Sequence, residues 1–303
     1  MNFNISLSAG RPVAVVSNYR GKYDNQIIYI SDKPDKERQD PFELLDIEDF
    51  LKDPKKFKLL SLEERINLAT YLETMDYEEE HKGDNKHIQD KYKQKSEKEF
   101  RIDCGNLVVL PDSKPERIFV AGKSGAGKSC WAAMYIREFN EMHPNSNIYL
   151  ISVHEDDQAY KGLPIIQLTL NEAFINDPPT LEDFRDCLVI FDDVDNLQDK
   201  KLSNAVEAVN NDLLANSRKY GTYVLTLHHH LMEYKRTRTL LNESNRVVFY
   251  PQGSAYHVQR YLKVYAGVSP ADISKIMAEK SRWICLDNGV PMNYITENAV
   301  VII

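Results

Sequence analysis

The sequence predicts an α/β fold in which a doubly wound, mainly parallel sheet follows a small α+β region. Three observations predict it. Short, wholly apolar runs of the kind that form buried parallel strands recur between residues 115 and 230. A glycine-rich turn joins the first of these runs to an amphipathic helical segment. The runs also lie far enough apart for the crossover connections that parallel strands require.

The glycine-rich turn has the G-x-x-x-x-G-K-[ST] pattern of a phosphate-binding loop, and it lies between the apolar run 117–121 and the helical segment 130–140. At such a turn, free backbone N–H groups and the positive end of the helix dipole point at an anion. Lys128 should reach the β- and γ-phosphates of ATP, and the Ser129 hydroxyl should contribute to a Mg²⁺ site. The residues expected to bind the nucleotide are Gly122, Lys123, Ser124, Gly125, Ala126, Gly127, Lys128, Ser129 and Cys130.

A Walker B pattern follows further along the chain, where the apolar run 187–191 ends in Asp192 and Asp193. Such a run fits a strand buried on both faces, so the two carboxylates should lie at the carboxyl edge of the sheet, where ligands bind. We expect Asp192 to hold Mg²⁺ through water. Asp193 points the other way and could polarise the attacking water, although Asp is shorter than the Glu that most NTPases place there.

Two more strands are expected, over residues 147–152 and 222–227, and the second runs into three consecutive histidines. This order is that of NTPases with an inserted central strand, in which the polar end of the last strand lies between the two motifs. His229 or His228 should then sense the γ-phosphate. Structural or capping histidines are one alternative. A metal site is another, but consecutive strand residues alternate faces, and no Cys lies at ligand spacing.

The stretch Arg218–Asn242 resembles the part that follows Walker B in FtsK/HerA-type ATPases of large DNA viruses, and it is most similar to the poxvirus-type virion packaging ATPases and their giant-virus relatives. The resemblance covers residues 115–285, and Arg218–Asn242 is its discriminating part. That family usually has an Arg-His pair before the strand and a Ser-His or Thr-His pair at its end; here Lys219 and His228 replace one member of each pair.

The resemblance implies a homo-oligomeric ring that moves double-stranded DNA into a capsid and has a capsid or portal protein as its partner. It also implies a cytoplasmic location, in the host cytoplasm or a virus factory, or association with the virion. Ring ATPases hydrolyse ATP when a neighbouring subunit inserts an arginine toward the γ-phosphate. Arg218 is the favoured candidate, and Arg236 and Arg238 are the others. The alternative is that these are solvated basic residues near a sheet edge or a helix end.

Contact with DNA is harder to place, because the formal net charge of −8 argues against a broad basic surface. A ring can instead line its pore with a few basic residues repeated by symmetry, and residues 235–238 are the best local patch. Residues 261–273 predict a helix, a turn and a second helix, with Ser269 as N-cap and Pro270 at the first helical position. A DNA-reading helix-turn-helix with a wing-like hairpin over 283–296 is one interpretation. Because the second helix is almost neutral, we favour a structural helical hairpin, followed by a β-hairpin over 283–296.

The domain boundary is expected after residue 114. Residues 1–114 form an accessory region, and residues 115–303 form the ATPase domain with the helical hairpin and the β-hairpin. In the accessory region, strands over 5–17, 27–31 and 101–110 either make a small β-rich subdomain or extend the core sheet. A helical insert is expected over 41–76. The highly charged residues 77–99 should form a solvated helix or a disordered linker.

Composition excludes several classes of protein. We expect no signal peptide and no membrane partner, because no apolar run approaches the roughly 18 residues that span a membrane. The four cysteines are scattered and fit reduced thiols. A small-molecule kinase would add an arginine-rich lid, and a GTPase would add an Asn-Lys-x-Asp motif; neither is present. The remaining competitor is an ATP-dependent switch in virion assembly or morphogenesis that does not move DNA, and a DNA-stimulated hydrolysis rate would separate the two functions.

Overall fold

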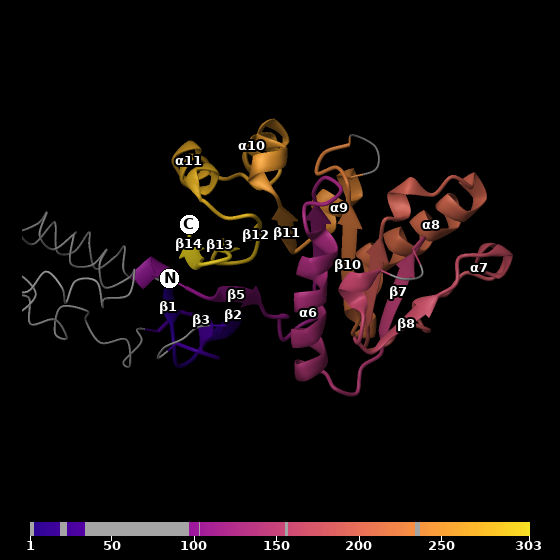
Figure 1. Cartoon of the computed structure of the whole chain (residues 1–303), viewed down its shortest axis with the longest axis horizontal. Coiled ribbons are helices and arrows are strands. Elements are labelled where there is room, and N and C mark those ends of the chain that lie inside the picture. The colour runs from indigo at the N-terminus through magenta and orange to yellow at the C-terminus, as the bar shows by residue number, and fades with distance from the viewer. Residues whose placement is uncertain (1–2, 19–22, 34–96, 103, 155–156, 234–236) are drawn as a thin grey trace, which may run out of the picture. The chain divides into compact units, whose positions relative to one another are not determined.

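The computed structural model describes residues 3–18, 23–33, 97–102, 104–154, 157–233 and 237–303 (Figure 1). The helical insert expected over 41–76 and nearly all of the charged segment 77–99 lie outside the described residues, and so do Lys235 and Arg236. Residue contacts divide the chain into two units. One is Met1–Val108 together with Asn293–Ile303, and the other is Val109–Met292.

The first unit contains short strands. A four-stranded sheet has the order β1 (Asn4–Ser6), β3 (Ile27–Ser31), β2 (Arg11–Ser17), β5 (Asn106–Val109). In addition, β14 (Ala299–Ile302) pairs antiparallel with both β4 (Glu99–Arg101) and β13 (Asn293–Thr296). The pairing of β14 with β4 is why the contacts group residues 293–303 with the N-terminal strands, whereas the sequence placed them with the ATPase domain.

The single strand expected over residues 5–17 is wrong, because the segment forms β1 and β2 with a break between them. Gly10 lies at the break with φ +139, and a Cβ on it would stand 2.5 Å from the Ile30 carbonyl oxygen. Only glycine fits this backbone conformation and this close approach. The strand expected over 101–110 is divided in the same way into β4 and β5.

The second unit holds the predicted α/β sheet. Its strands lie in the order β12 (Ile284–Asp287), β11 (Arg246–Phe249), β6 (Arg117–Ala121), β10 (Tyr223–His228), β9 (Leu188–Asp192), β7 (Ile148–Ser152), β8 (Ile165–Leu168). Neighbours from β11 to β8 are parallel, and β12 is antiparallel to β11. The fold-class prediction is confirmed: β10 is the inserted strand, and it pairs with β6 on one side and β9 on the other.

Helices flank this sheet: α6 (Lys128–Met142), α7 (Glu172–Asn176), α8 (Lys200–Asn216), α9 (Arg238–Glu243), α10 (Ala255–Val264) and α11 (Pro270–Ala278) (Figure 1). Helix α6 buries Trp131, Tyr135 and Phe139, which are spaced four residues apart. Residues at this spacing share one helix face, so α6 is held against the sheet by a single apolar stripe.

The helical hairpin expected near residue 267 is confirmed, since α10 and α11 pack against each other. The turn between them uses Gly267 at φ +67. Ser269 is the N-cap of α11, and its Oγ accepts a hydrogen bond from the Asp272 backbone N–H at 3.2 Å. Such a cap satisfies a donor that the first helical turn would otherwise leave unpaired.

A buried ionic cluster lies where β6 and β11 begin. Arg246 Nη1 is 3.2 Å from the Glu116 carboxylate, and Arg246 Nε is 3.2 Å from Asp287 Oδ2. The Tyr135 hydroxyl donates a hydrogen bond to Glu116 Oε1 at 2.9 Å. We call Glu116, Tyr135, Arg246 and Asp287 the amino-edge cluster. It ties α6, β11 and β12 to the segment that leads into β6.

All four cysteines are free thiols, as the sequence predicts. Burial raises the pKa of the Cys187 thiol to about 12, so this thiol stays protonated near neutral pH. Among the described residues, we find no helix with the length and apolar character needed to cross a membrane.

Candidate functional site

The phosphate-binding loop lies at the carboxyl edge of the sheet, between the end of β6 and the start of α6. Gly125 and Gly127 have φ values of +74 and +101, and, apart from the adjoining residues of the chain, no described heavy atom lies within 4 Å of a Cβ built on either. Glycine is needed there for the left-handed backbone, not for space. Gly122 is needed for space, because its Cβ would stand 2.6 Å from the Tyr250 ring. The Gly122 N–H donates to the His228 carbonyl oxygen at 3.1 Å, which fixes the loop to the end of β10.

Lys128 and Ser129 form the first turn of α6. Lys128 is buried, and Ser129 is half-buried. Cys130 is exposed, as are Lys123 and Ser124 in the loop itself. The backbone N–H groups of this turn have no intrahelical acceptor, so they are available to an anion.

Asp192, the last residue of β9, lies beside Ser129. The Ser129 hydroxyl is 3.4 Å from Asp192 Oδ2, and the Tyr160 hydroxyl donates to the same oxygen at 2.6 Å. The other oxygen, Oδ1, is buried and has no hydrogen-bond partner among the residues that the structure describes. Burial raises the pKa of the Asp192 carboxyl, and the neighbouring Asp193 adds to the rise, while the Tyr160 hydrogen bond and Lys128 oppose it.

These atoms fit a magnesium ion. Carboxylate and hydroxyl oxygens are the ligands that Mg²⁺ prefers. Asp192 Oδ1 is a buried acceptor to which no described residue donates a hydrogen bond, and a nearby cation would offset the burial that raises the pKa of this carboxyl. The sequence-predicted pair of Ser129 and Asp192 is therefore brought together.

Asp193 follows Asp192 with φ +54, an unusual left-handed conformation for a residue other than glycine. Its carboxylate lies between two histidines: Oδ1 is 3.4 Å from His229 Nε2, and Oδ2 is 3.5 Å from His154 Nε2. The side chain is 25% exposed. Asp193 thus stands next to the residue predicted to act as the sensor.

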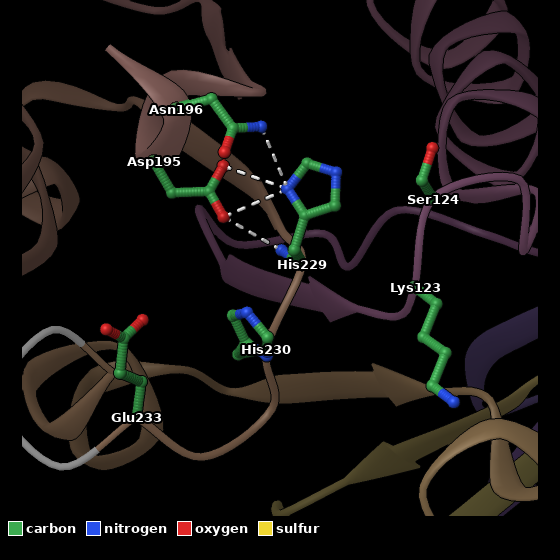
Figure 2. A pocket seen from close by; sticks show the side chains of 7 residues that line it. All are labelled: Lys123, Ser124, Asp195, Asn196, His229, His230 and Glu233. Carbon is green, nitrogen blue, oxygen red and sulfur yellow. Dashed lines mark hydrogen bonds and ion pairs between the residues drawn. The ribbon is translucent and has the colours of Figure 1, made fainter. Parts of the chain in front are cut away.

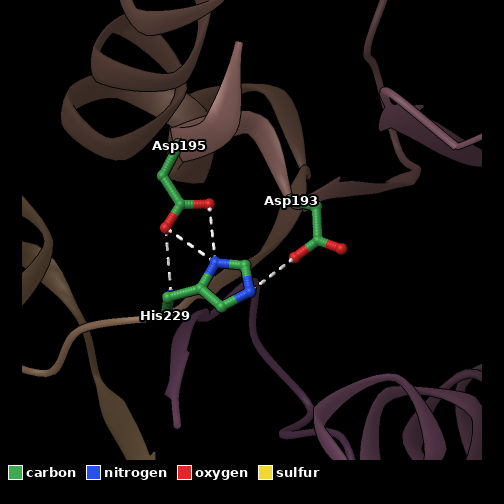
Figure 3. Close-up of side chains that lie close together, drawn as sticks. All are labelled: Asp193, Asp195 and His229. Atoms are coloured by element: carbon green, nitrogen blue, oxygen red, sulfur yellow. Dashed lines mark hydrogen bonds and ion pairs between the residues drawn. The ribbon is translucent and has the colours of Figure 1, made fainter. Parts of the chain in front are cut away.

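His229, the residue after β10, lies between two carboxylates (Figure 3). Its Nε2 faces Asp193, and its Nδ1 is 3.0 Å from Asp195 Oδ2. Ligand atoms of these three residues lie within 4.8 Å of one another, a spacing that could also hold a metal ion. We call Asp193, Asp195 and His229 the carboxyl-edge cluster.

His228 has a different environment. Its side chain is 6% exposed and packs edge-on against the Phe119 ring. Its Nδ1 accepts a hydrogen bond from the His230 backbone N–H at 3.3 Å. Burial lowers the pKa of His228, although the Asp195 carboxylate opposes this shift. Of the two sensor candidates, His229 is the one whose ring reaches an open surface.

An open pocket of about 410 Å³ lies next to the loop (Figure 2). Its walls come from the phosphate-binding loop, from the segment after β9 and from the segment after β10. The lining residues are Lys123, Ser124, Asp195, Asn196, His229, His230 and Glu233. The pocket therefore brings the loop and the carboxyl-edge cluster to one space, as expected for the carboxyl ends of parallel strands.

Arg218 lies at the opposite edge. It is exposed and belongs to the short helix η3 (Ser217–Tyr220) that leads into the start of β10. Its charge acts on Arg117, the first residue of β6, and adds to the burial that lowers the pKa of that guanidinium. Strand β6 separates this edge from the phosphate-binding loop by about 13 Å. Arg218 therefore does not reach the loop of its own chain. Arg238 is exposed at the start of α9.

Two residues near the site were not predicted as site residues. Tyr160, in the short helix η1 (Gln158–Tyr160), holds Asp192, and burial raises its own pKa well above the usual range of tyrosine. Asp195 holds His229. Asp195 could have been found from the sequence, because it follows β9 and the histidines follow the neighbouring strand. No motif pointed to Tyr160.

No protein-family model matches the chain. The chain is 32% identical to uncharacterized protein V3 of Sputnik virophage over 207 residues, which are 67% of this chain and 84% of that protein.

Solved structures similar to the chain include viral packaging NTPases, the class that the sequence resembles. The genome packaging NTPase B204 of Sulfolobus turreted icosahedral virus 2, in complex with ATP-γS, has 11% identity and a TM-score of 0.41, and the match covers 60% of this chain and 98% of that chain. The pCW3 conjugation coupling protein TcpA, in its monomer form with ATP-γS, has 12% identity and a TM-score of 0.39, with 65% of this chain and 62% of that chain covered. From its sequence identity and coverage, the chain belongs to the family of the Sputnik virophage protein V3.

Proposed function

We propose that this protein is an ATP-hydrolysing motor that moves double-stranded DNA into a viral capsid. One observation carries the hydrolytic part. At one edge of the sheet lie a phosphate-binding loop, an oxygen of Asp192 that is buried without a hydrogen-bond partner among the described residues, and His229, which lines the adjoining pocket and stands beside Asp193. Phosphoryl transfer needs these three elements: a cradle for the phosphates, a metal ligand and a group that orients water.

Each residue then has a role. Lys128 and the backbone of the loop bind the β- and γ-phosphates, and Ser129 with Asp192 holds Mg²⁺. Bound Mg²⁺ neutralises charge that develops on the phosphate oxygens. Asp193 orients the attacking water. His229, next to Asp193 and at the pocket wall, senses whether the γ-phosphate is present.

The proposal that the protein moves DNA rests on other observations. The Arg218–Asn242 stretch resembles virion packaging ATPases, and the relative that shows the family is a viral protein. The position of Arg218 fits a ring, because this exposed arginine lies at the edge opposite the loop. In a homo-oligomeric ring, Arg218 would complete the site of a neighbour. The proposed partners are double-stranded DNA and a capsid or portal protein.

The test is ATP hydrolysis by the purified protein with and without long double-stranded DNA, with Lys128→Ala as the blank. Stimulation by DNA well above the blank supports the motor. Hydrolysis that DNA does not change would favour the switch in virion assembly. The net charge of −8 favours that alternative, because it argues against a broad basic surface for DNA. No hydrolysis above the blank would overturn the proposed ATPase.

A further inference from the structure

Asp195 is the member of the carboxyl-edge cluster without a role in the proposed chemistry. It belongs to the short helix η2 (Val194–Asn196), directly after β9, and its side chain is only 5% exposed. It meets the residue after β10 at two points. Asp195 Oδ2 accepts a hydrogen bond from the His229 backbone N–H at 3.0 Å, and its two oxygens lie 3.0 and 3.2 Å from the ring Nδ1 of His229 (Figure 3).

This contact fixes the position of one proton. A carboxylate can only accept hydrogen bonds, so an imidazole nitrogen held against both of its oxygens must carry a proton. Asn196 Nδ2 is 3.3 Å from the same Nδ1 and cannot donate to a protonated nitrogen. The Asn196 amide can turn its oxygen toward the ring instead, since amide orientations are assigned from their surroundings.

The other ring nitrogen, Nε2, faces one oxygen of Asp193 at 3.4 Å, which is longer than the 3.0 and 3.2 Å contacts of Nδ1 with Asp195, so a neutral ring holds its proton on Nδ1. Nε2 is then the ring atom that takes or gives a proton on the side where water would be oriented. Asp193 is confined in turn by its left-handed backbone and by His154 on its other oxygen.

The other histidine near Asp195 does not compete for this role. His228 Nδ1 lies 3.4 Å from Asp195 Oδ2, but that nitrogen already accepts a hydrogen bond from the His230 backbone N–H. It therefore has no proton to give to Asp195 while the ring is neutral.

We propose that Asp195 is a positioning residue that holds the His229 ring with its proton on Nδ1 and its Nε2 aimed at Asp193. Asp193, which orients water, is thereby coupled to the ring of His229, which senses the γ-phosphate. This role of Asp195 rests on the proposed ATP hydrolysis. The physical logic is that of an aspartate that sets the tautomer of a catalytic histidine.

Asp195→Asn is the informative variant. Its amide oxygen can still accept from the His229 backbone N–H, so the loop keeps its anchor. Its NH₂ group then faces the ring, which favours a lone pair on Nδ1 and moves the proton to Nε2. We expect kcat for ATP hydrolysis to fall by at least about tenfold, which is less than the roughly 10²–10⁴-fold of a general acid or base because Asp195 acts only through His229, while KM changes by less than about twofold. Asp212→Asn, an exposed aspartate of α8, is the matched control and should retain the wild-type rate.

A double-mutant cycle separates positioning from a general loss of structure. If Asp195 acts through His229, adding Asp195→Asn to His229→Gln should lower kcat by less than about twofold further, because the two changes disable one unit. Multiplied losses in the double variant would overturn the proposal.

The tautomer of the His229 ring can also be determined without measuring turnover, from long-range ¹⁵N–¹H correlations of the histidine rings in NMR spectra. The signals of His229 are assigned as those that are missing from the spectrum of His229→Gln. The chain has eight histidines. The wild type should show a protonated Nδ1 at His229, and Asp195→Asn should show the proton on Nε2. An unprotonated Nδ1 in the wild type would overturn the proposal. If the wild type hydrolyses no ATP above Lys128→Ala, the proposed function fails, and the ring spectrum still decides whether Asp195 holds His229.

Discussion

Two charged clusters lie at opposite edges of the same sheet, and they differ in exposure. In the amino-edge cluster, the charged side chains of Glu116, Arg246 and Asp287 are 1–4% exposed. In the carboxyl-edge cluster, Asp193 and His229 are 25% and 19% exposed, and only Asp195 is as enclosed as the amino-edge residues, at 5%. The first cluster joins strands and α6 to one another, whereas the second opens onto a pocket.

The difference shows which buried charges are structural. The guanidinium of Arg246 is enclosed by two carboxylates and also donates to the Leu110 carbonyl oxygen at 2.7 Å. Burial alone would lower the pKa of Arg246, but Glu116 and Asp287 outweigh it and raise that pKa above the usual value. At the carboxyl edge, Asp192 keeps an oxygen without a described partner. Arg246 Nη2 at the amino edge likewise has no hydrogen-bond partner among the described residues, so access is what separates the two edges. The enclosed amino-edge cluster stabilises the fold, whereas the carboxyl edge lies beside a pocket and is available to a ligand.

The largest expected effect is at the amino edge. Arg246→Ala leaves Glu116 and Asp287 buried without their cation, and breaking a buried pair in this way costs about 3–5 kcal/mol. The free energy of unfolding, measured in urea, should fall by that amount. Arg260→Ala, which truncates an exposed arginine of α10, is the control and should change it by less than about 0.5 kcal/mol. Equal losses in the two variants would contradict the structural role of the cluster.

Asp192→Asn should separate stability from activity. ATP hydrolysis should fall by about 10²–10³-fold, since the variant would hold less firmly the Mg²⁺ that offsets charge on the phosphate oxygens. The melting temperature without nucleotide should stay the same or rise, because burial raises the pKa of this carboxyl and its charge is unfavourable there. If the variant loses stability together with activity, Asp192 has a structural role like that of the amino-edge cluster.

Arg218→Ala should leave stability unchanged, because the side chain is exposed. If Arg218 acts on a neighbouring subunit, DNA-stimulated hydrolysis should fall by at least about tenfold. Mixing this variant with Lys128→Ala protein should restore part of the activity, since a subunit with an intact loop can then receive the arginine of its neighbour. Unchanged DNA-stimulated hydrolysis in Arg218→Ala would remove the arginine from the mechanism.

The smallest effect concerns pH. Burial lowers the pKa of His228, so the unfolded chain binds a proton at a higher pH than the folded one. The stability that depends on a neutral His228 is therefore fully present above the pKa of histidine in the unfolded chain, about 6.5, and it is lost as the pH falls below that pKa. The melting temperature should therefore decline less between pH 7 and pH 5 in His228→Gln than in the wild type. His257→Gln, which replaces an exposed residue of α10, should show the same decline in melting temperature as the wild type.

The sequence was sufficient where a local pattern determines the structure. The phosphate-binding loop needs glycines at Gly125 and Gly127 for positive φ, and the apolar runs of β6, β9 and β10 are buried on both faces. Because the strands are parallel, their order also placed Asp192 and His229 at one edge. The short strands β8 and β11, four residues each, gave too little pattern to be predicted.

Contacts between distant segments were not predictable in this way. Tyr160 meets Asp192 only because η1 packs against α6, and the sequence between β7 and β8 shows no periodicity that would reveal it. The amino-edge cluster joins Glu116 to Arg246 across 130 positions of the chain. Such pairs depend on the register of neighbouring strands, which a single sequence does not specify.

The most direct test of the proposed motor is the displacement of a third strand from a DNA triplex by the purified protein, followed over time with ATP. A protein that moves along double-stranded DNA should release the third strand only with ATP, and the Lys128→Ala protein should release none. Wild-type protein that hydrolyses ATP but releases no third strand from DNA of any length would contradict translocation and support the assembly switch.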